Sequence, residues 1–203
     1  MNVERELDAL TTALGATISS EAHELLLRFA QLVAQWNARM DLTAAKTPEQ
    51  IVEVLFADSL MLAREDVVPP HSRIVDVGSG AGAPALPLLL LRPDVQATLV
   101  EPLQKRVAFM RTVCGTLSDL AKRVTLVAGK IDPSAPQVKG APFDVAMARA
   151  TFAPEVWLPA GKKLAQCVLV LTAEAQEYGE APTHLVSYTL PRTKARRVIG
   201  VYS

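Results

Sequence analysis

Three glycines and two acids in one stretch of the chain have the types and spacing that bind a nucleoside. The stretch contains Asp76, Gly78, Gly80 and Gly82, and Glu101 follows nineteen positions after Gly82. Glycines between a strand and a helix allow a tight turn and a close approach of the backbone to a ligand, because they carry no Cβ. A carboxylate at the end of the next strand is placed to accept hydrogen bonds from ribose hydroxyls. The pattern therefore predicts a ligand that contains a nucleoside.

Two classes of cofactor use such a pattern. The dinucleotide fingerprint G-x-G-x-x-G/A can be laid on Gly78, Gly80 and Ala83, which would indicate NAD and an oxidoreductase. The tighter alternation of glycine over residues 78–82 and the long helical segment before it favour S-adenosyl-L-methionine. Pro84 also lacks the N–H group that a pyrophosphate at a helix N-terminus would require. We expect S-adenosyl-L-methionine, with NAD as the alternative and a purely structural glycine turn as a third interpretation.

The elements that must position this turn are short apolar runs that alternate with helical segments. Such alternation indicates βαβ units and a parallel sheet. Two further β-rich runs near the end of the chain are joined by a short turn, which forces an antiparallel pair. The sequence predicts an α/β fold, a Rossmann-like class I S-adenosylmethionine-dependent methyltransferase whose mostly parallel sheet ends in an antiparallel hairpin. The strands are expected at residues 74–77, 97–100, 124–127, 143–147, 167–171, 185–190 and 196–201.

Helical signals dominate the chain before the glycine turn. Apolar residues recur at spacings of three and four over residues 25–40, and Thr47, Pro48 and Gln50 form a helix-opening signal. Pro69 and the proline after it then read as a linker. We expect an N-terminal helical cap over residues 1–66 and a Rossmann-like domain over residues 67–203, joined in one structural unit.

Other candidate site residues follow the third and fourth expected strands. In a doubly wound sheet ligands bind beyond the carboxyl ends of the strands. Ile131 and Asp132 are therefore expected near the adenine ring, since an apolar side chain and an acceptor suit its face and its exocyclic amine. Arg149 is expected over the reacting centre, and this role is preferred to a surface ion pair. For Asp58, a solvated position and a position at the edge of the cleft stay equally open.

Charge gives only a local signal. Basic and acidic residues number 21 each, so the net charge does not indicate a nucleic-acid partner. The terminal hairpin is locally basic. These basic residues either contact phosphates or prevent an exposed sheet edge from pairing with another strand. The cluster comprises Arg192, Lys194, Arg196 and Arg197.

Cysteine usage and hydropathy bear on the compartment. Cys114 and Cys167 lie far apart without metal-ligand spacing, which fits buried free thiols in a reducing compartment and no metal site. No apolar run approaches the length of a membrane span, and the charged start of the chain is unlike a signal peptide. We expect a cytoplasmic monomer.

Short motifs spread over most of the chain form a specific set. They are Trp36-Asn37, Leu42-Thr43, Asp58-Ser59-Leu60, residues 76–82, Lys105-Arg106-Val107 with Phe109, and Arg149-Ala150. This set resembles the glucose-inhibited division protein B family, whose members are bacterial methyltransferases that use S-adenosyl-L-methionine to methylate N7 of a guanine in 16S ribosomal RNA. The resemblance therefore implies 16S rRNA or the small ribosomal subunit as the partner.

The resemblance also assigns roles to the candidate residues. It places Gly78 and its neighbours around the methionine part, Glu101 at the ribose, and Arg149 in the reaction pocket as the catalytic residue. No general base is expected, because guanine N7 carries a lone pair and no proton. The full set of cofactor-binding residues expected is Asp76, Gly78, Gly80, Gly82, Ala83, Glu101, Ile131, Asp132 and Arg149.

Four positions depart from the usual pattern of that family. They leave the glycine motif intact and bear on the substrate rather than on the fold. A methyltransferase for another RNA or for a small molecule, and an NAD-dependent oxidoreductase, therefore stay as alternative functions. The departures are Asp41, Leu55, Ala85 and Thr172.

Overall fold

The chain begins with three helices, and its strands follow with helices between most of the parallel ones. The computed structural model describes residues 3–45, 47–117, 119–174 and 178–203. The helices are α1 (Val3–Ala13), α2 (Ser20–Met40), α3 (Pro48–Leu62), α4 (Ala85–Leu91), α5 (Gln104–Thr116), α6 (Leu120–Arg123) and α7 (Pro154–Lys162). The strands are β1 (Arg73–Val77), β2 (Gln96–Glu101), β3 (Val124–Ala128), β4 (Phe143–Ala148), β5 (Ala165–Thr172), β6 (His184–Thr189) and β7 (Arg196–Tyr202).

The strands form one seven-stranded sheet in the order β3-β2-β1-β4-β5-β7-β6. Strands β1 to β5 pair in parallel, and β7 pairs antiparallel with both β5 and β6. All seven strands predicted from the sequence are therefore present. The predicted fold, a mostly parallel sheet that ends in an antiparallel hairpin, is confirmed.

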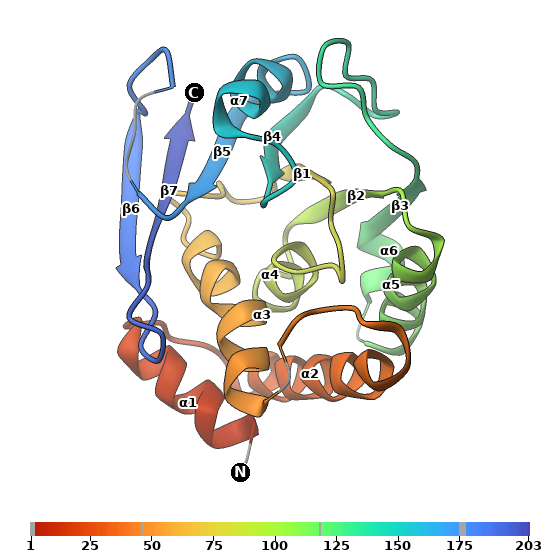
Figure 1. Ribbon diagram of the computed structural model, residues 1–203, viewed down its shortest axis with the longest axis vertical. Coiled ribbons are helices and arrows are strands. Elements are labelled where there is room, and N and C mark those ends of the chain that lie inside the picture. Colours follow the sequence, from red (N-terminus) through yellow and green to blue (C-terminus); the bar gives the residue numbers. More distant parts are fainter. Residues whose placement is uncertain (1–2, 46, 118, 175–177) are drawn as a thin grey trace.

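Helices cover both faces of the central part of the sheet: α4 and α5 contact one face, and α7 contacts the other over β4 and β5 (Figure 1). Successive side chains of a strand point to opposite faces. In β1, Ile74 belongs to the core shared with α1 to α5, whereas Val75 belongs to the core under α7. Burial on both faces explains why these strands read as continuous apolar runs rather than as an alternation.

The N-terminal helices begin at the capping residues expected from the sequence. Ser19 accepts a hydrogen bond from the N–H of Ala22, and Thr47 forms a capping box with Gln50. Helix α3 is then almost entirely buried, because it contacts α1, α2 and α4 and also binds the hairpin turn, as described below. The N-terminal helices and the sheet share one hydrophobic core. The boundary near residue 66 stays a prediction.

The hairpin formed by β6 and β7 folds back onto the N-terminal helices, and its turn lies beside α1 (Figure 1). The backbone N–H groups of Arg192 and Thr193 donate to Oε1 of Glu53 on α3, at 2.9 and 3.5 Å. A carboxylate near the middle of α3 thus holds the turn of the hairpin.

The glycine turn is held by packing as well as by its backbone conformation. Gly82 has φ +81°, and a Cβ at this position would overlap Leu86 Cδ1 and press on Met110 Cγ. Only glycine satisfies both conditions at this position.

We predict that Gly82→Ala lowers the free energy of unfolding by about 2–4 kcal/mol, because it combines backbone strain with overpacking. Gly115→Ala is the matched control, since Gly115 lies in α5 with no atom within 4 Å of an added Cβ. The control should raise the free energy of unfolding by up to about 1 kcal/mol. Urea titrations of both variants would measure the difference, and equal effects would contradict this account.

Candidate active site

A cavity of about 580 Å³, here called the glycine-loop pocket, opens beyond the carboxyl ends of β1 and β2. Side chains of α3 and of the loop after β4 close it from other sides. Five residues predicted from the sequence line it, namely Gly78, Gly80, Ala83, Glu101 and Arg149. The structure therefore brings together one part of the predicted site in one cavity.

Glu101 is fixed at the end of β2 by the glycine loop. Its Oε2 accepts a hydrogen bond from the N–H of Gly80 at 2.8 Å, and its Oε1 accepts one from the N–H of Leu103 at 2.9 Å. Arg106 Nη1 lies 3.9 Å from the same carboxylate. The side chain is almost fully buried, yet it lines the pocket. A hydrogen-bond acceptor is thus held at the position predicted for a ribose.

The glycine loop leaves room for a ligand at one position in particular. Gly78, Gly80 and Gly82 all have positive φ. A Cβ at Gly80 would meet no atom closer than the carbonyl oxygen of Gly78 at 4.0 Å, so this glycine faces open space. At Gly78, in contrast, Thr151 from the loop after β4 occupies the space that a side chain would need. A ligand therefore gains the closest access to the backbone at Gly80.

Asp76 lies beneath the glycine loop and does not line the pocket. It is 1% exposed, and its Oδ2 has no hydrogen-bond partner among the residues that the structure describes. Burial raises the pKa of this carboxyl to about 7, although a hydrogen bond with Ser79 and the charge of Arg149 oppose the shift. A carboxylate without a full set of partners is stabilised by a cation nearby.

The loop that follows α2 reaches the pocket because Asn37 folds it back. Asn37 Nδ2 donates to the carbonyl of Ala45 at 3.0 Å, and Asn37 Oδ1 accepts from the N–H of Thr43 at 2.9 Å. Leu42 and Thr43 then line the glycine-loop pocket. These contacts explain the spacing of the Trp36-Asn37 and Leu42-Thr43 motifs.

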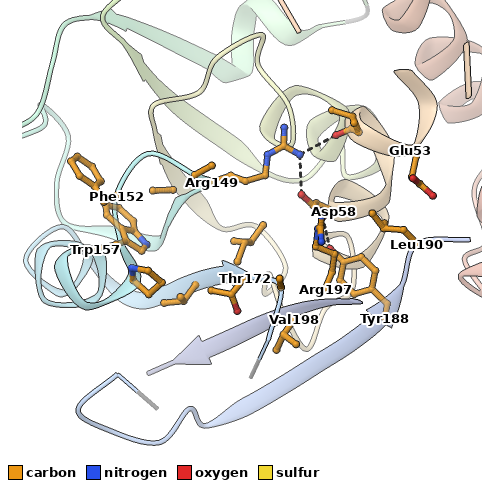
Figure 2. Close-up of a pocket in the computed structure, with 17 residues that line it drawn as sticks. Glu53, Asp58, Arg149, Phe152, Trp157, Thr172, Tyr188, Leu190, Arg197 and Val198 are labelled. Atoms are coloured by element: carbon orange, nitrogen blue, oxygen red, sulfur yellow. Dashed lines mark hydrogen bonds and ion pairs between the residues drawn. The ribbon is translucent and has the colours of Figure 1, made fainter. Parts of the chain in front are cut away.

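A second cavity of about 490 Å³, here called the β4–β5 pocket, lies beyond the carboxyl ends of those strands and beside the hairpin (Figure 2). Phe152 and Trp157 form a parallel stacked pair on one side of it, with ring centroids 6.1 Å apart. Val54, Arg149 and Ala150 line both cavities. The two pockets therefore adjoin, and Arg149 belongs to the wall that they share.

Arg149 is held in that wall by three acceptors. Its Nη1 donates to Asp58 Oδ2 at 2.9 Å and to the carbonyl of Val54 at 3.0 Å, and its Nη2 donates to the carbonyl of Ala83 at 3.1 Å. The arginine thus joins α3, the glycine loop and the end of β4. Asp58 is buried against Arg149, which decides between the two positions left open by the sequence.

Tyr188 is a site residue that the sequence analysis missed. It lies on β6, and its hydroxyl donates to Asp58 Oδ1 (Figure 2). Burial and then the negative charge of Asp58 raise the pKa of Tyr188 above its ordinary value, so the phenol stays protonated and keeps donating. No local signal identifies Tyr188, because Asp58 lies 130 positions earlier in the chain.

The basic residues of the hairpin do not form one surface cluster. Arg197 lines the β4–β5 pocket, and Arg192 Nη1 lies 4.0 Å from a carboxylate oxygen of Glu6 on α1. Lys194 and Arg196 are exposed. Alternation along β7 sends Arg196 and Arg197 to opposite faces. Contact of the exposed basic residues with phosphates, or protection of the sheet edge, stays a prediction.

Ile131 and Asp132 lie outside the lining of both pockets. Ile131 is buried in the core under α7, and the carboxylate of Asp132 accepts hydrogen bonds from the N–H and hydroxyl of Ser134. The predicted contact of these two residues with adenine stays a prediction.

Three other expectations concern a metal site, a membrane-spanning helix and the cysteines. Among the described residues, no group of three or more His, Cys, Asp or Glu side chains is arranged to hold a metal ion. In the same part of the chain, no helix combines the length and the apolar character required to cross a bilayer. Cys114 and Cys167 are free thiols, and burial raises the pKa of Cys114 to about 11.

Several solved structures with a similar fold are described as methyltransferases. A protein of Pyrococcus horikoshii described as an RNA methyltransferase superposes with a TM-score of 0.61 at 16% identity, over 91% of this chain and 98% of that one. An S-adenosylmethionine-dependent methyltransferase of Geobacter sulfurreducens in complex with S-adenosyl-L-homocysteine superposes with a TM-score of 0.52 at 13% identity, over 80% of this chain and 58% of that one. At these identities the likeness establishes the fold alone.

Curated relatives are named Ribosomal RNA small subunit methyltransferase G. The protein of Myxococcus xanthus is 31% identical over 98% of this chain and 96% of its own length. The protein of Methylobacillus flagellatus is 35% identical over 73% of this chain and 68% of its own length. The match to the Clostridium beijerinckii protein, 34% identical, spans 67% of this chain and 56% of that relative.

The family model described as rRNA small subunit methyltransferase G, or GidB, matches residues 22–171. That range contains the glycine loop, Glu101, Asp58 and Arg149. The resemblance inferred from the sequence motifs is confirmed, and a family of methyltransferases gives no support to the NAD alternative. The chain belongs to the GidB family of small-subunit rRNA methyltransferases.

Proposed function

We propose that this protein transfers a methyl group from S-adenosyl-L-methionine to N7 of a guanine in 16S rRNA. The observation that carries the proposal is the bond between the N–H of Gly80 and the carboxylate of Glu101, which forms one side of an open pocket. This combination of a backbone N–H and a carboxylate suits the ribose of an adenosine. Membership in the family supports a guanine of 16S rRNA as the methyl acceptor.

The glycine-loop pocket would hold the cofactor. Glu101 would accept hydrogen bonds from the ribose hydroxyls, and the open backbone at Gly80 would approach the methionine part. The ionised form of Asp76 would stabilise the cationic end of the cofactor from below. The proposal also places Ile131 and Asp132 at the adenine ring. The loop after β3 would have to shift to bring these two residues to the pocket.

The β4–β5 pocket would hold the acceptor base, with Arg149 beside the place where the two reactants have to meet. When bound, S-adenosyl-L-methionine supplies a methyl group on a cationic sulfur, which the N7 lone pair takes without losing a proton. The protein therefore has to align the two reactants and to exclude water. Alignment alone can lower the activation free energy by roughly 7 to 11 kcal/mol. Arg149, held by three acceptors, provides a fixed wall for that alignment.

The proposal extends to the rest of the chain. Residues 1–66 would close the site, since Leu42, Thr43 and α3 contact the pockets, and residues 67–203 would build it. The reaction would need no metal, and a monomer acting on the small ribosomal subunit in the cytoplasm would suffice. A different RNA acceptor is the alternative.

The reaction is tested by incubating the protein with labelled S-adenosyl-L-methionine and 30S subunits or 16S rRNA from a strain that lacks this methylation. Label that maps to N7 of one guanine is the expected result. Calorimetric titration with S-adenosyl-L-homocysteine and with NADH tests the cofactor separately. Tight binding of NADH without binding of the thioether would refute the proposal, and so would the absence of label on both RNA substrates.

We predict that Glu101→Gln lowers the affinity for S-adenosyl-L-homocysteine by about 10- to 100-fold, since hydrogen bonds to a charged group contribute roughly 1.5–3 kcal/mol. Glu155→Gln on the exposed side of α7 removes the same charge outside both pockets and serves as the control. Calorimetry of both variants makes the comparison. Equal affinities would remove Glu101 from the binding site.

We predict that cofactor affinity rises as the pH increases through about 7 and levels off above it. In the free protein the raised pKa of Asp76 leaves its carboxyl partly protonated at neutral pH, and a cationic cofactor favours the ionised form. Asp76→Asn cannot ionise, so its affinity should be lower and should lack this rise. Calorimetric titrations with S-adenosyl-L-methionine from roughly pH 6 to 8 would show it. An unchanged slope in the variant would contradict the role of Asp76.

A further inference from the structure

Arg197 is the guanidinium group of the β4–β5 pocket that the protein leaves without strong partners. It lies on β7 opposite Tyr188 of β6 and lines the pocket (Figure 2). Its one hydrogen bond among the described residues runs from Nη1 to the carbonyl of its neighbour Arg196, at 2.9 Å, and it forms no ion pair there. An arginine has five N–H donors, so most of those of Arg197 are available to a ligand.

Arg149 differs from Arg197 in this respect. Three of its donors are bound to protein acceptors, and its charge is balanced by the buried carboxylate of Asp58. The contact between Tyr188 and Asp58 fixes that pair further. Arg149 is therefore part of the wall, whereas Arg197 lines the pocket without an ion-pair partner among the described residues.

The chemistry of the acceptor determines which contact such a cation can make. Guanine presents two acceptors on one edge, O6 and N7, and arginine commonly binds both. Here N7 must stay free to receive the methyl group, so an arginine in this pocket can bind O6 but not N7. Adenine carries an amino group in place of O6, so the same contact excludes adenine.

We propose that Arg197 determines the specificity for guanine by donating a hydrogen bond to O6 of a base turned out of the RNA into the β4–β5 pocket. This inference rests on the proposed function. N7 donates its electron pair to the methyl carbon, the C–S bond breaks, and its electrons remain on sulfur as a neutral thioether. The base gains the positive charge, so its contact with the cationic Arg197 weakens after transfer and the product is released.

The first test compares Arg197→Ala with Arg196→Ala. Both variants lose one positive charge from adjacent positions of β7, but Arg196 is exposed and does not line the pocket. Arg196→Ala therefore measures the share of RNA affinity that comes from charge alone. We expect kcat/KM for the RNA to fall at least about 10-fold further in Arg197→Ala, with the affinity for S-adenosyl-L-homocysteine unchanged. Equal losses in the two variants would overturn the assignment.

The second test changes the base. The mapped guanine is replaced, in 16S rRNA assembled by ligation, with inosine, which keeps O6 and N7, or with 2-aminopurine, which keeps N7 and lacks O6. The wild-type protein should methylate inosine at least about 10-fold faster than 2-aminopurine, and Arg197→Ala should lose this preference. Equal use of both bases by the wild type, or a preference kept by Arg197→Ala, would overturn the inference. If the wild type labels no natural guanine, the proposed function falls, and the role of Arg197 falls with it.

Discussion

The ion pair between Asp58 and Arg149 joins the parts of the molecule that make its site. Burying a carboxylate is costly unless a cation and hydrogen bonds compensate it, and removing one partner of a buried pair leaves an uncompensated charge. Asp58 meets that requirement with a guanidinium from the end of β4 and a phenol from β6. Helix α3, the glycine loop, β4 and the hairpin are consequently held in one arrangement, and the two pockets take their shapes from it.

Much of the fold could be predicted because its signals are local. The capping residues Ser19 and Thr47 mark helix starts within a few positions of the hydrogen bonds that they make. The central strands are recognisable as apolar runs because helices cover both faces of the sheet there. The position of Glu101 in the site could also be predicted. In a βαβ unit, the end of the second strand lies beside the turn after the first strand, so the carboxylate of Glu101 meets the glycine loop.

The rest of the site could not be predicted, because it depends on contacts between distant elements. The pairing of Tyr188 with Asp58 requires the strand order, in which β7 inserts between β5 and β6. The separation of Arg197 from the other basic residues of the hairpin requires knowing which face of β7 meets α3. Ile131 and Asp132 were placed by the rule that ligands bind beyond strand ends, but that rule does not specify how the loop after β3 folds.

The support of the hairpin by α3 also has a consequence for how the protein matures. Glu53 and Asp58 precede the groups that they bind, at residues 188–193, by 130 to 140 positions. Because synthesis runs from the N-terminus, a chain that has been made only as far as β5 lacks the hairpin wall of the β4–β5 pocket. The order of elements along the chain therefore lets the parallel part of the sheet form before this pocket is complete.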